Sequence, residues 1–164
     1  MKRCLLIFCL LVVLQVEASA ENRVFKVGGV SMLPTLKPGQ RVTVDTSHYH
    51  AHPFERGHLV AITFSTRKKP MVKRIIALSG NRVEIKNSRI MISGTSPEGL
   101  GYNTTRDIAP GSGKILAIQL KRYGNRVPPG TLIVSGDNQE NTFDSLDYGI
   151  ISKNQIMGRV FPDE

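Results

Sequence analysis

The sequence predicts a mainly β domain, in which short antiparallel strands form a folded sheet or a barrel-like arrangement. Apolar residues occur in short runs rich in β-branched side chains, which is typical of strands. Glycine and proline together make up 24 of the 164 residues, and tryptophan is absent, which suits strands joined by turns better than a helical bundle. No segment shows a long 3.6-residue period. With 40% hydrophobic and 21% charged residues, the chain has the composition of one globular domain.

The first 20 residues differ from the rest of the chain. Two basic residues precede an unbroken apolar run of 11 residues, and Ala-Ser-Ala follows at positions 18–20. This order is typical of a secretory signal. The apolar run is shorter than the roughly 20 apolar residues of a membrane-spanning helix. We therefore expect residues 1–20 to be an export signal cleaved after Ala20 or a short retained membrane anchor, and residues 21–164 to form the folded domain.

The expected strands follow one another from residue 24 to the end of the chain. The segment 41–45 alternates polar and apolar residues, as half-buried strands do, whereas 58–64 and 71–78 are more continuous apolar runs typical of buried strands. An Asn-Ser turn between two alternating segments predicts a hairpin. Residues 93–113 are rich in glycine, serine, threonine and proline, and we expect an exposed loop or insertion there. The full set of expected strands is 24–27, 41–45, 58–64, 71–78, 83–86, 89–92, 114–123, 131–134 and 150–161.

A glycine- and proline-containing stretch at residues 28–36, Gly-Gly-Val-Ser-Met-Leu-Pro-Thr-Leu, holds a candidate reactive serine. Pro34 fixes its own φ and disfavours the helical region for Leu33, so the chain is extended or turning here. Such a stretch can present the hydroxyl and the backbone N–H of Ser31 to an incoming group. The alternative is a tight loop whose serine is satisfied by its neighbours.

Lys73 lies inside an apolar strand run, between Met71-Val72 and Ile75-Ile76. A buried lysine loses its charge more easily than an exposed one, and a neutral amine can take the proton of a serine hydroxyl. The alternative is a strand lysine whose stem covers the core while its head reaches water.

A third polar stretch follows the expected strand 131–134. Ser-Gly-Asp-Asn at residues 135–138 is typical of a tight turn. Thr142, Asp144 and Ser145 come shortly afterwards and make a dense polar cluster that could support an active site.

Four stretches, in their order along the chain, resemble the motifs of the type I signal peptidase family, which includes the bacterial leader peptidases and the mitochondrial inner-membrane proteases. They are residues 31–36, 56–60 (Arg-Gly-His-Leu-Val), 72–80 and 136–145, the last beginning with Gly-Asp-Asn and ending with Asp-Ser. Any one of these motifs is weak, but an ordered set with a serine and a lysine in the required places is specific. The resemblance covers most of residues 24–161.

The resemblance implies a Ser-Lys dyad, with Ser31 as the nucleophile and Lys73 as the general base. It implies that the backbone N–H of Ser31 is one oxyanion donor and that Thr142 orients the lysine. Asp144 and Ser145 fall in the supporting C-terminal motif. The resemblance implies neither a cofactor nor a metal ion.

The chain departs from the family pattern at three places. Gly29 stands where some members carry a serine that completes the oxyanion hole, so a second donor must come from the backbone or from water. Leu146 stands where an arginine usually follows Asp-Ser and pairs with the aspartate, so we expect Asp144 to have another partner. Ser79 and Asn81 replace the more usual proline and aspartate.

The function that the resemblance implies is that of a membrane-associated serine endopeptidase. It would remove signal peptides from exported precursors after small residues of the Ala-x-Ala type, with its catalytic domain on the exported, periplasmic or extracytoplasmic side. Its partners would be precursor proteins and the membrane lipid surface, and we expect no nucleic-acid partner. One alternative is a specialised peptidase of the same family that processes conjugation or pilin precursors. Another is a non-catalytic exported β-domain that binds anionic surfaces.

Charge and cysteine content narrow these alternatives. The net charge is +9, and it is +8 for residues 21–164, but the basic residues are scattered, which is typical of a solvated surface. Both cysteines lie in the first 20 residues, which excludes a disulfide framework, a cysteine nucleophile and a thiolate metal site for the rest of the chain. His48, His50 and His52 alternate and could share one face around zinc if they lay in a strand, although a loop beside Pro53 is the commoner arrangement.

Overall fold

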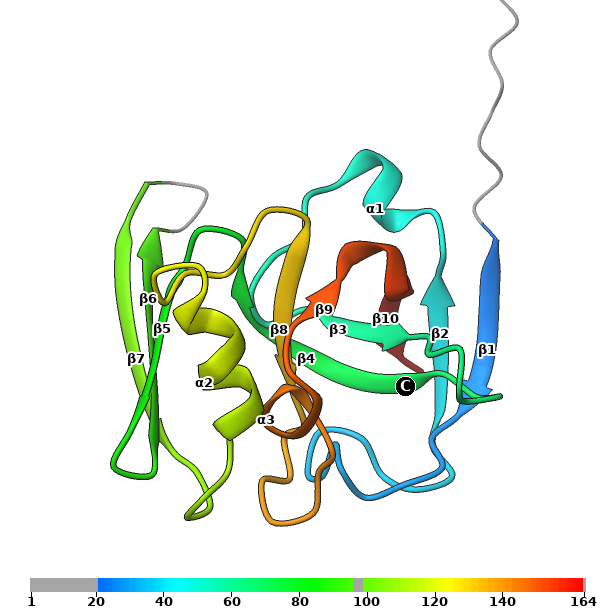
Figure 1. The fold of residues 1–164 in the computed structure, drawn as a ribbon. Coiled ribbons are helices and arrows are strands. Elements are labelled where there is room, and N and C mark those ends of the chain that lie inside the picture. Colours follow the sequence, from blue (N-terminus) through cyan, green and yellow to red (C-terminus); the bar gives the residue numbers. More distant parts are fainter. Residues whose placement is uncertain (1–20, 96–98, 164) are drawn as a thin grey trace, which may run out of the picture.

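Two antiparallel sheets, three α-helices and one short 3₁₀ helix make up the part of the chain that the computed structural model describes, residues 21–95 and 99–163. The expected export segment, residues 1–20, lies outside the described residues. Figure 1 shows the larger sheet on the right and the smaller sheet with helix α2 on the left. The mainly β architecture predicted from the sequence is confirmed.

The strands and helices have the following bounds along the chain: β1 Asn22–Lys26, β2 Arg41–Asp45, α1 His48–Ala51, β3 Leu59–Ile62, β4 Met71–Leu78, β5 Arg82–Lys86, β6 Arg89–Thr95, β7 Gly101–Asp107, α2 Lys114–Lys121, β8 Thr131–Ser135, α3 Ser145–Tyr148, β9 Ile151–Ser152, the 3₁₀ helix η1 Lys153–Gln155 and β10 Ile156–Pro162.

The larger sheet has seven strands in the order β1-β2-β10-β3-β4-β8-β9. The C-terminal strand β10 therefore lies between β2 and β3, which brings the two ends of the described chain into one sheet. Strand β4 lies between β3 and β8, so Lys73 is opposite Val60 and Arg74 is opposite Ser135. Because successive side chains of a strand point to opposite faces, Lys73 and Arg74 have different surroundings.

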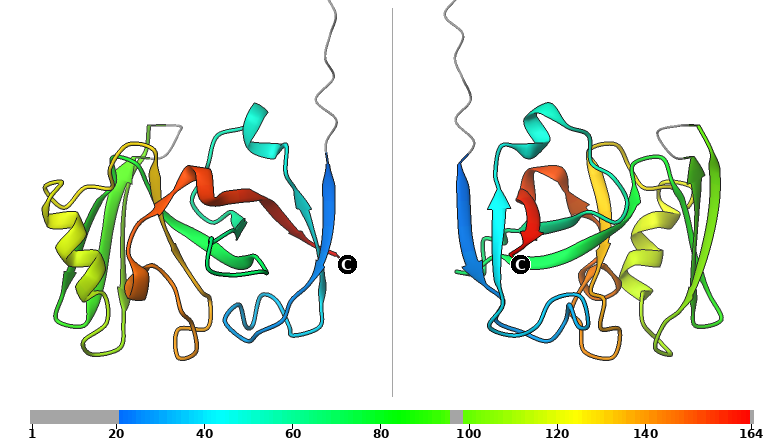
Figure 2. Two further views of the ribbon diagram at one scale, coloured as in Figure 1. Left: turned by 45° about the vertical axis from the view of Figure 1, so that its right-hand side comes forward. Right: turned by 180° about the vertical axis from the view of Figure 1, so that it is seen from behind.

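The smaller sheet has the order β5-β6-β7. It packs with α2 over a core of apolar side chains that includes Val83, Ile90, Leu116 and Leu120. The views in Figure 2 show α2 beside this sheet, away from β1 and β2. Two further apolar clusters fill the larger sheet, one of them directly beneath the turn that carries Ser31. The hairpin of β5 and β6 has positive φ at Asn87 (51°) and Ser88 (55°), which is typical of a two-residue turn and confirms the predicted hairpin.

The prediction of a strand at 114–123 is wrong, because Lys114–Lys121 forms α2. The segment carries apolar residues at 115, 116, 118 and 120, a pattern that fits both a buried strand and a short helix. The structure buries Leu116 and Leu120, which lie one helical turn apart, and leaves Ile115 and Ile118 exposed.

The expected loop at 93–113 also needs correction. Strand β6 continues to Thr95, and Gly101–Asp107 forms β7. Five of the seven side chains of β7 are exposed, because it is an edge strand, and its polar composition therefore hides its pairing with β6. Residues 150–161 form β9, η1 and β10 in place of one strand. Residues 48–51 form helix α1, so the alternating histidines do not share a strand face.

Candidate active site

The turn after β1 presents Ser31 at the edge of the larger sheet. Met32 and Leu36 are 1% and 0% exposed and anchor this turn in the apolar cluster beneath it. The Leu36 N–H donates to the Met32 carbonyl at 2.9 Å, so the turn between them is closed. The Asn138 N–H donates to the Ser31 carbonyl at 3.0 Å, which fastens the turn to the loop after β8. The half-buried Ser31 side chain thus stands between two fixed segments.

Lys73 lies directly against the Ser31 side chain. Its Nζ is 2.8 Å from Ser31 Oγ and 2.9 Å from Thr142 Oγ1. The lysine is only 2% exposed. Burial lowers the pKa of the Lys73 amine below its usual value, and the nearby carboxylates of Asp144 and Asp147 offset this only in part. The neutral form of the Lys73 amine is therefore more favoured than the neutral form of an exposed lysine.

Asp144 is fully buried behind Thr142. Its Oδ2 accepts hydrogen bonds from Ser135 Oγ at 2.7 Å, from the Gly136 N–H at 2.9 Å and from Thr142 Oγ1 at 3.3 Å. Its Oδ1 accepts from the Leu146 N–H at 2.9 Å, which caps helix α3. A buried carboxylate needs donors to its oxygens, because an unsatisfied one is costly. Asp144 therefore has two hydroxyl partners and two backbone N–H partners where the family pattern predicts an arginine from position 146.

A second buried polar group ties this region together. Ser145 Oγ accepts from the Val134 N–H at 3.0 Å, so it joins α3 to β8 and does not face Lys73. Leu146 packs against the apolar cluster of the smaller sheet. Leu146 is thus a partly buried apolar residue that packs on this cluster.

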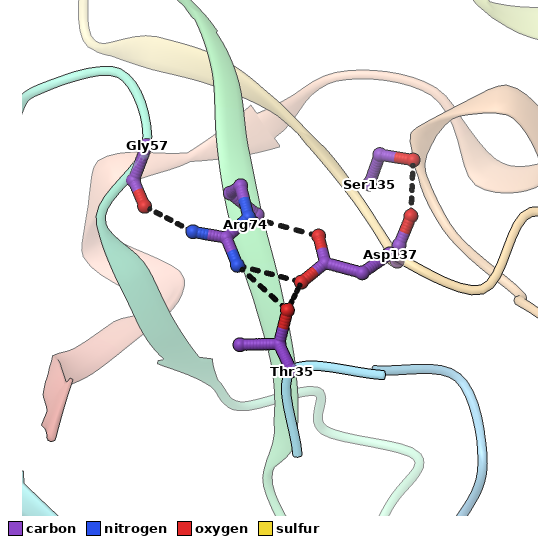
Figure 3. Close-up of polar contacts among 6 residues, drawn as sticks. Thr35, Gly57, Arg74, Ser135 and Asp137 are labelled. Carbon is purple, nitrogen blue, oxygen red and sulfur yellow. Dashed lines mark hydrogen bonds and ion pairs between the residues drawn. The ribbon is translucent and has the colours of Figure 1, made fainter. Parts of the chain in front are cut away.

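Arg74 forms a clamp on the opposite face of β4. Its Nε and Nη2 donate to the two carboxylate oxygens of Asp137 at 2.8 and 2.6 Å, and its Nη1 donates to the Gly57 carbonyl at 2.8 Å. Thr35 Oγ1, from the turn of the candidate nucleophile, donates to Asp137 Oδ2 at 2.6 Å. Figure 3 shows these groups converging on Arg74 from the turn after β1, the segment before β3 and the loop after β8. Burial acts to raise the pKa of Asp137, but the hydrogen bonds and charge of Arg74 and the hydroxyl of Thr35 outweigh it and lower that pKa.

The backbone on the other side of Ser31 is open. A Cβ placed on Gly29 would meet no atom within 4 Å. Within the described residues, the Ser31 N–H donates to no backbone carbonyl. Gly136 is the opposite case, because a Cβ there would collide with the Thr142 side chain and with the Ser31 carbonyl. Close packing requires glycine at position 136. No contact in the structure requires glycine at position 29.

Comparison with known proteins assigns the family. The profile of the family described as "Signal peptidase, peptidase S26" matches residues 1–162. The chain belongs to this signal peptidase family. It is 32% identical over 142 residues to signal peptidase IB of Staphylococcus aureus, covering 83% of this chain and 74% of the relative. It is 34% identical over 147 residues to signal peptidase I of Bacillus amyloliquefaciens, covering 82% and 69%.

A crystal structure of a signal peptidase I from Enterococcus faecalis shares 20% identity and covers 66% of this chain and 97% of that chain, with a TM-score of 0.45. At this TM-score the assignment rests on the family profile and the sequence relatives. Membership makes this signal peptidase a serine peptidase, and the family's activity is the removal of signal peptides from precursor proteins. Among the described residues, no helix is long and apolar enough to cross a membrane.

The structure brings four of the predicted site residues of this signal peptidase into one hydrogen-bonded chain: Ser31, Lys73, Thr142 and Asp144. Gly29 lies beside the serine turn, and Ser145 points away from it. The sequence reading missed Thr35 and Ser135, which bind the two aspartates. Thr35 lies in a turn and Ser135 is the last residue of β8, and no local pattern separates either from ordinary small polar residues at such positions. In the described part of the chain, no group of three or more His, Cys, Asp or Glu side chains is arranged to hold a metal ion.

Proposed function

We propose that this signal peptidase cleaves precursors with a Ser-Lys dyad, in which Ser31 is the nucleophile and Lys73 is the general base. The observation that carries the proposal is the 2.8 Å separation between Lys73 Nζ and Ser31 Oγ, with the lysine 2% exposed. A general base must lie within hydrogen-bond reach of its proton and must be able to lose its own charge. The contact of Lys73 with Ser31 provides the hydrogen-bond reach, and the burial of Lys73 makes its charge easier to lose.

In the first half-reaction, Ser31 Oγ attacks the carbonyl carbon of the scissile bond while its proton passes to the neutral Lys73 amine. The Ser31 N–H donates to the carbonyl oxygen as it becomes negatively charged, and removal of one such donor costs about 2.7–4 kcal/mol in a comparable peptidase. The Lys73 ammonium then gives its proton to the leaving amine nitrogen. The C–N bond breaks, and the signal peptide remains on Ser31 as an ester.

In the second half-reaction, water attacks the ester carbonyl and gives a proton to Lys73. The bond between the acyl carbon and Ser31 Oγ breaks, and the proton returns to the serine. Thr142 Oγ1 accepts a hydrogen bond from Lys73 Nζ and donates its own to Asp144 Oδ2, so it fixes the amine with its lone pair toward Ser31. A base positioned in this way contributes about 10²–10⁴-fold to the rate.

The substrates are exported precursors with small residues before the scissile bond, as in Ala-x-Ala, and cleavage takes place at the membrane surface on the exported side. Membership of the signal peptidase family supports this specificity and location. Open space at Gly28 and Gly29 supports the close approach of an extended peptide backbone beside the serine turn. Residues 1–20 are the export signal or anchor in this proposal, and residues 21–164 are the catalytic domain.

The test is cleavage of a labelled precursor peptide with Ala-x-Ala before the scissile bond, by the full chain in detergent. Ser31→Ala and Lys73→Ala should each lower kcat/KM by at least about 10³-fold, because each removes a reacting group. Ser93→Ala and Lys86→Ala, both on the smaller sheet, are matched controls and should retain full activity. Residual activity of either dyad variant near that of its control would contradict the assignment.

A second peptide series tests the specificity. Replacing the alanine before the scissile bond with valine and then phenylalanine should lower kcat/KM stepwise. Equal cleavage of the whole series would contradict the Ala-x-Ala preference. Cleavage confined to a pilin or conjugation precursor would support the specialised peptidase.

A further inference from the structure

One arginine of the smaller sheet reaches toward the active site. Arg106 lies on β7, whose side chains are mostly exposed, but is itself half-buried. Its Nη2 donates to Ser135 Oγ at 3.0 Å. Its Nε is buried and has no hydrogen-bond partner among the described residues. Burying an arginine nitrogen without a hydrogen-bond partner costs free energy. The position of Arg106 on an edge strand does not explain that cost.

Arg106 and Leu146 line the same cleft. Thr142 and Asp144 also line it. Leu146 contributes only apolar surface to this cleft and offers no charge. The guanidinium of Arg106 enters the cleft from the smaller sheet. Arg106 approaches the Asp144 region from β7 of the smaller sheet, whereas Leu146 approaches it from helix α3.

A short path of hydrogen bonds leads from Arg106 to the lysine. The single proton of the Ser135 hydroxyl points to Asp144 Oδ2, 2.7 Å away, because a carboxylate is the stronger acceptor. A lone pair of Ser135 Oγ therefore faces the Arg106 donor. The same Asp144 oxygen lies 3.3 Å from Thr142 Oγ1, which is 2.9 Å from Lys73 Nζ.

We propose that Arg106 is a positioning residue for Lys73, and that it supplies from β7 the cation that position 146 lacks. By holding Ser135 against Asp144, it fixes the acceptor that orients Thr142, and Thr142 orients the lysine amine. The inference rests on the proposed Ser31–Lys73 dyad. It assigns a role in the reaction to the segment between β6 and α2.

The sign of the electrostatic effect follows from the charges around the lysine. The carboxylates of Asp144, Asp147 and Asp137 act to raise the pKa of Lys73, whereas Arg67, from the connection between β3 and β4, acts to lower it. Arg74 lies on the opposite face of β4, in its pair with Asp137. The charge of Arg106 is coupled to the carboxylates of Asp144 and Asp137. Removing it should raise the pKa of Lys73, because the Asp144 carboxylate keeps its bonds from the Gly136 and Leu146 N–H groups and its negative charge is then less compensated.

The experiment compares three variants of the full chain. Arg106→Met keeps the apolar stem and removes the guanidinium. Arg89→Met is the matched control, because Arg89 belongs to the same sheet and forms only an exposed pair with Asp107. The double variant Arg106→Met with Leu146→Arg restores a cation to the cleft from helix α3. Each is assayed for kcat and KM against pH on the labelled Ala-x-Ala peptide, and the Lys73 amine is titrated directly by side-chain NMR.

Arg106→Met should lower kcat at pH 7 by about 10- to 100-fold, the loss expected for a hydrogen bond to a charged group, with KM little changed. The loss should shrink as the pH is raised, and the NMR titration of Lys73 should move to higher pH. Arg89→Met should match the unmodified chain, and the double variant should recover most of the activity. A merely structural arginine would lower the melting temperature without moving the titration.

An Arg106→Met variant equal to Arg89→Met in rate and titration would overturn the inference. A loss of kcat that Leu146→Arg does not reverse, with an unchanged titration of Lys73, would also overturn the inference. If Ser31→Ala is inactive and Arg106→Met is active, the proposed dyad stands and only the proposed role of Arg106 is refuted. If the unmodified chain cleaves no peptide, the proposed function fails, and the NMR titration still decides whether Arg106 acts on Lys73.

Discussion

Replacing Asp137 with asparagine should destabilise the protein by an amount that depends on pH. The carboxylate accepts two hydrogen bonds from Arg74 and one from Thr35, and the side chains of Arg74 and Asp137 are 31% and 16% exposed. The pair thus lies between an exposed ion pair, worth about 0–1 kcal/mol, and a buried pair, whose disruption costs about 3–5 kcal/mol. We expect a loss of about 2 kcal/mol for Asp137→Asn.

For a domain of this size, that loss corresponds to a fall in Tm of about 4–8 °C at pH 7. The folded protein lowers the pKa of Asp137, so the stabilisation is complete above the unfolded value of about 3.9 and is lost as the pH falls through the lower folded value. Thermal unfolding followed by circular dichroism from pH 7 to pH 2.5 should show the two proteins converging at the acid end.

Asp107→Asn is the matched control, because Asp107 forms an exposed pair with Arg89, and its Tm should stay close to that of the unmodified chain at every pH. Equal Tm values for Asp137→Asn and the unmodified chain at pH 7 would refute the reasoning. A difference that persists unchanged at pH 2.5 would show that Asp137 acts by shape and not by charge.

Three other substitutions follow from the site. Lys73→Met should abolish cleavage yet raise the Tm at pH 7 by about 2–4 °C, because burial lowers the pKa of Lys73 and the unfolded chain therefore binds more protons than the folded chain. The gain in Tm should shrink as the pH approaches about 10. A gain that does not change with pH would argue against a charge effect. Thr142→Val should lower kcat by about 10- to 100-fold with little change in KM, because Lys73 loses the hydroxyl that orients it; steady-state kinetics would expose an error if only KM moved. Gly136→Ala should lower both activity and Tm, because its Cβ would collide with Thr142 and the Ser31 carbonyl; an active, equally stable variant would show that the turn relaxes freely.

The parts of the fold and the site that the sequence predicts are those with local signals. Strand β4 is a continuous apolar run interrupted by Lys73, and the Asn87-Ser88 turn marks a hairpin without any knowledge of the rest of the chain. The serine turn is equally local, because Pro34 restricts its backbone and the two glycines allow it to turn. Ordered motifs then connect the serine with the lysine, although only the fold shows them 2.8 Å apart.

What the sequence does not predict depends on packing between distant segments. Residues 114–121 fit two periods, and burial of Leu116 and Leu120 against the smaller sheet decides for the helix. Strand β7 is polar because it lies at a sheet edge, so its pairing with β6 cannot be seen in its composition. The partners of Asp144 are a serine of β8 and backbone N–H groups, and these become neighbours only when α3 packs on β8.

The neighbouring positions of Lys73 and Arg74 on β4 restrict how this gene can change in length. A strand alternates its side chains between two faces, so loss or gain of one codon between Met71 and Lys73 would turn the lysine toward Asp137 and the arginine toward Ser31. One such event would remove the base and break the clamp together. Residues 65–69, in the exposed connection that precedes β4, are free of this constraint, so length differences between homologues should accumulate there and be absent from β4.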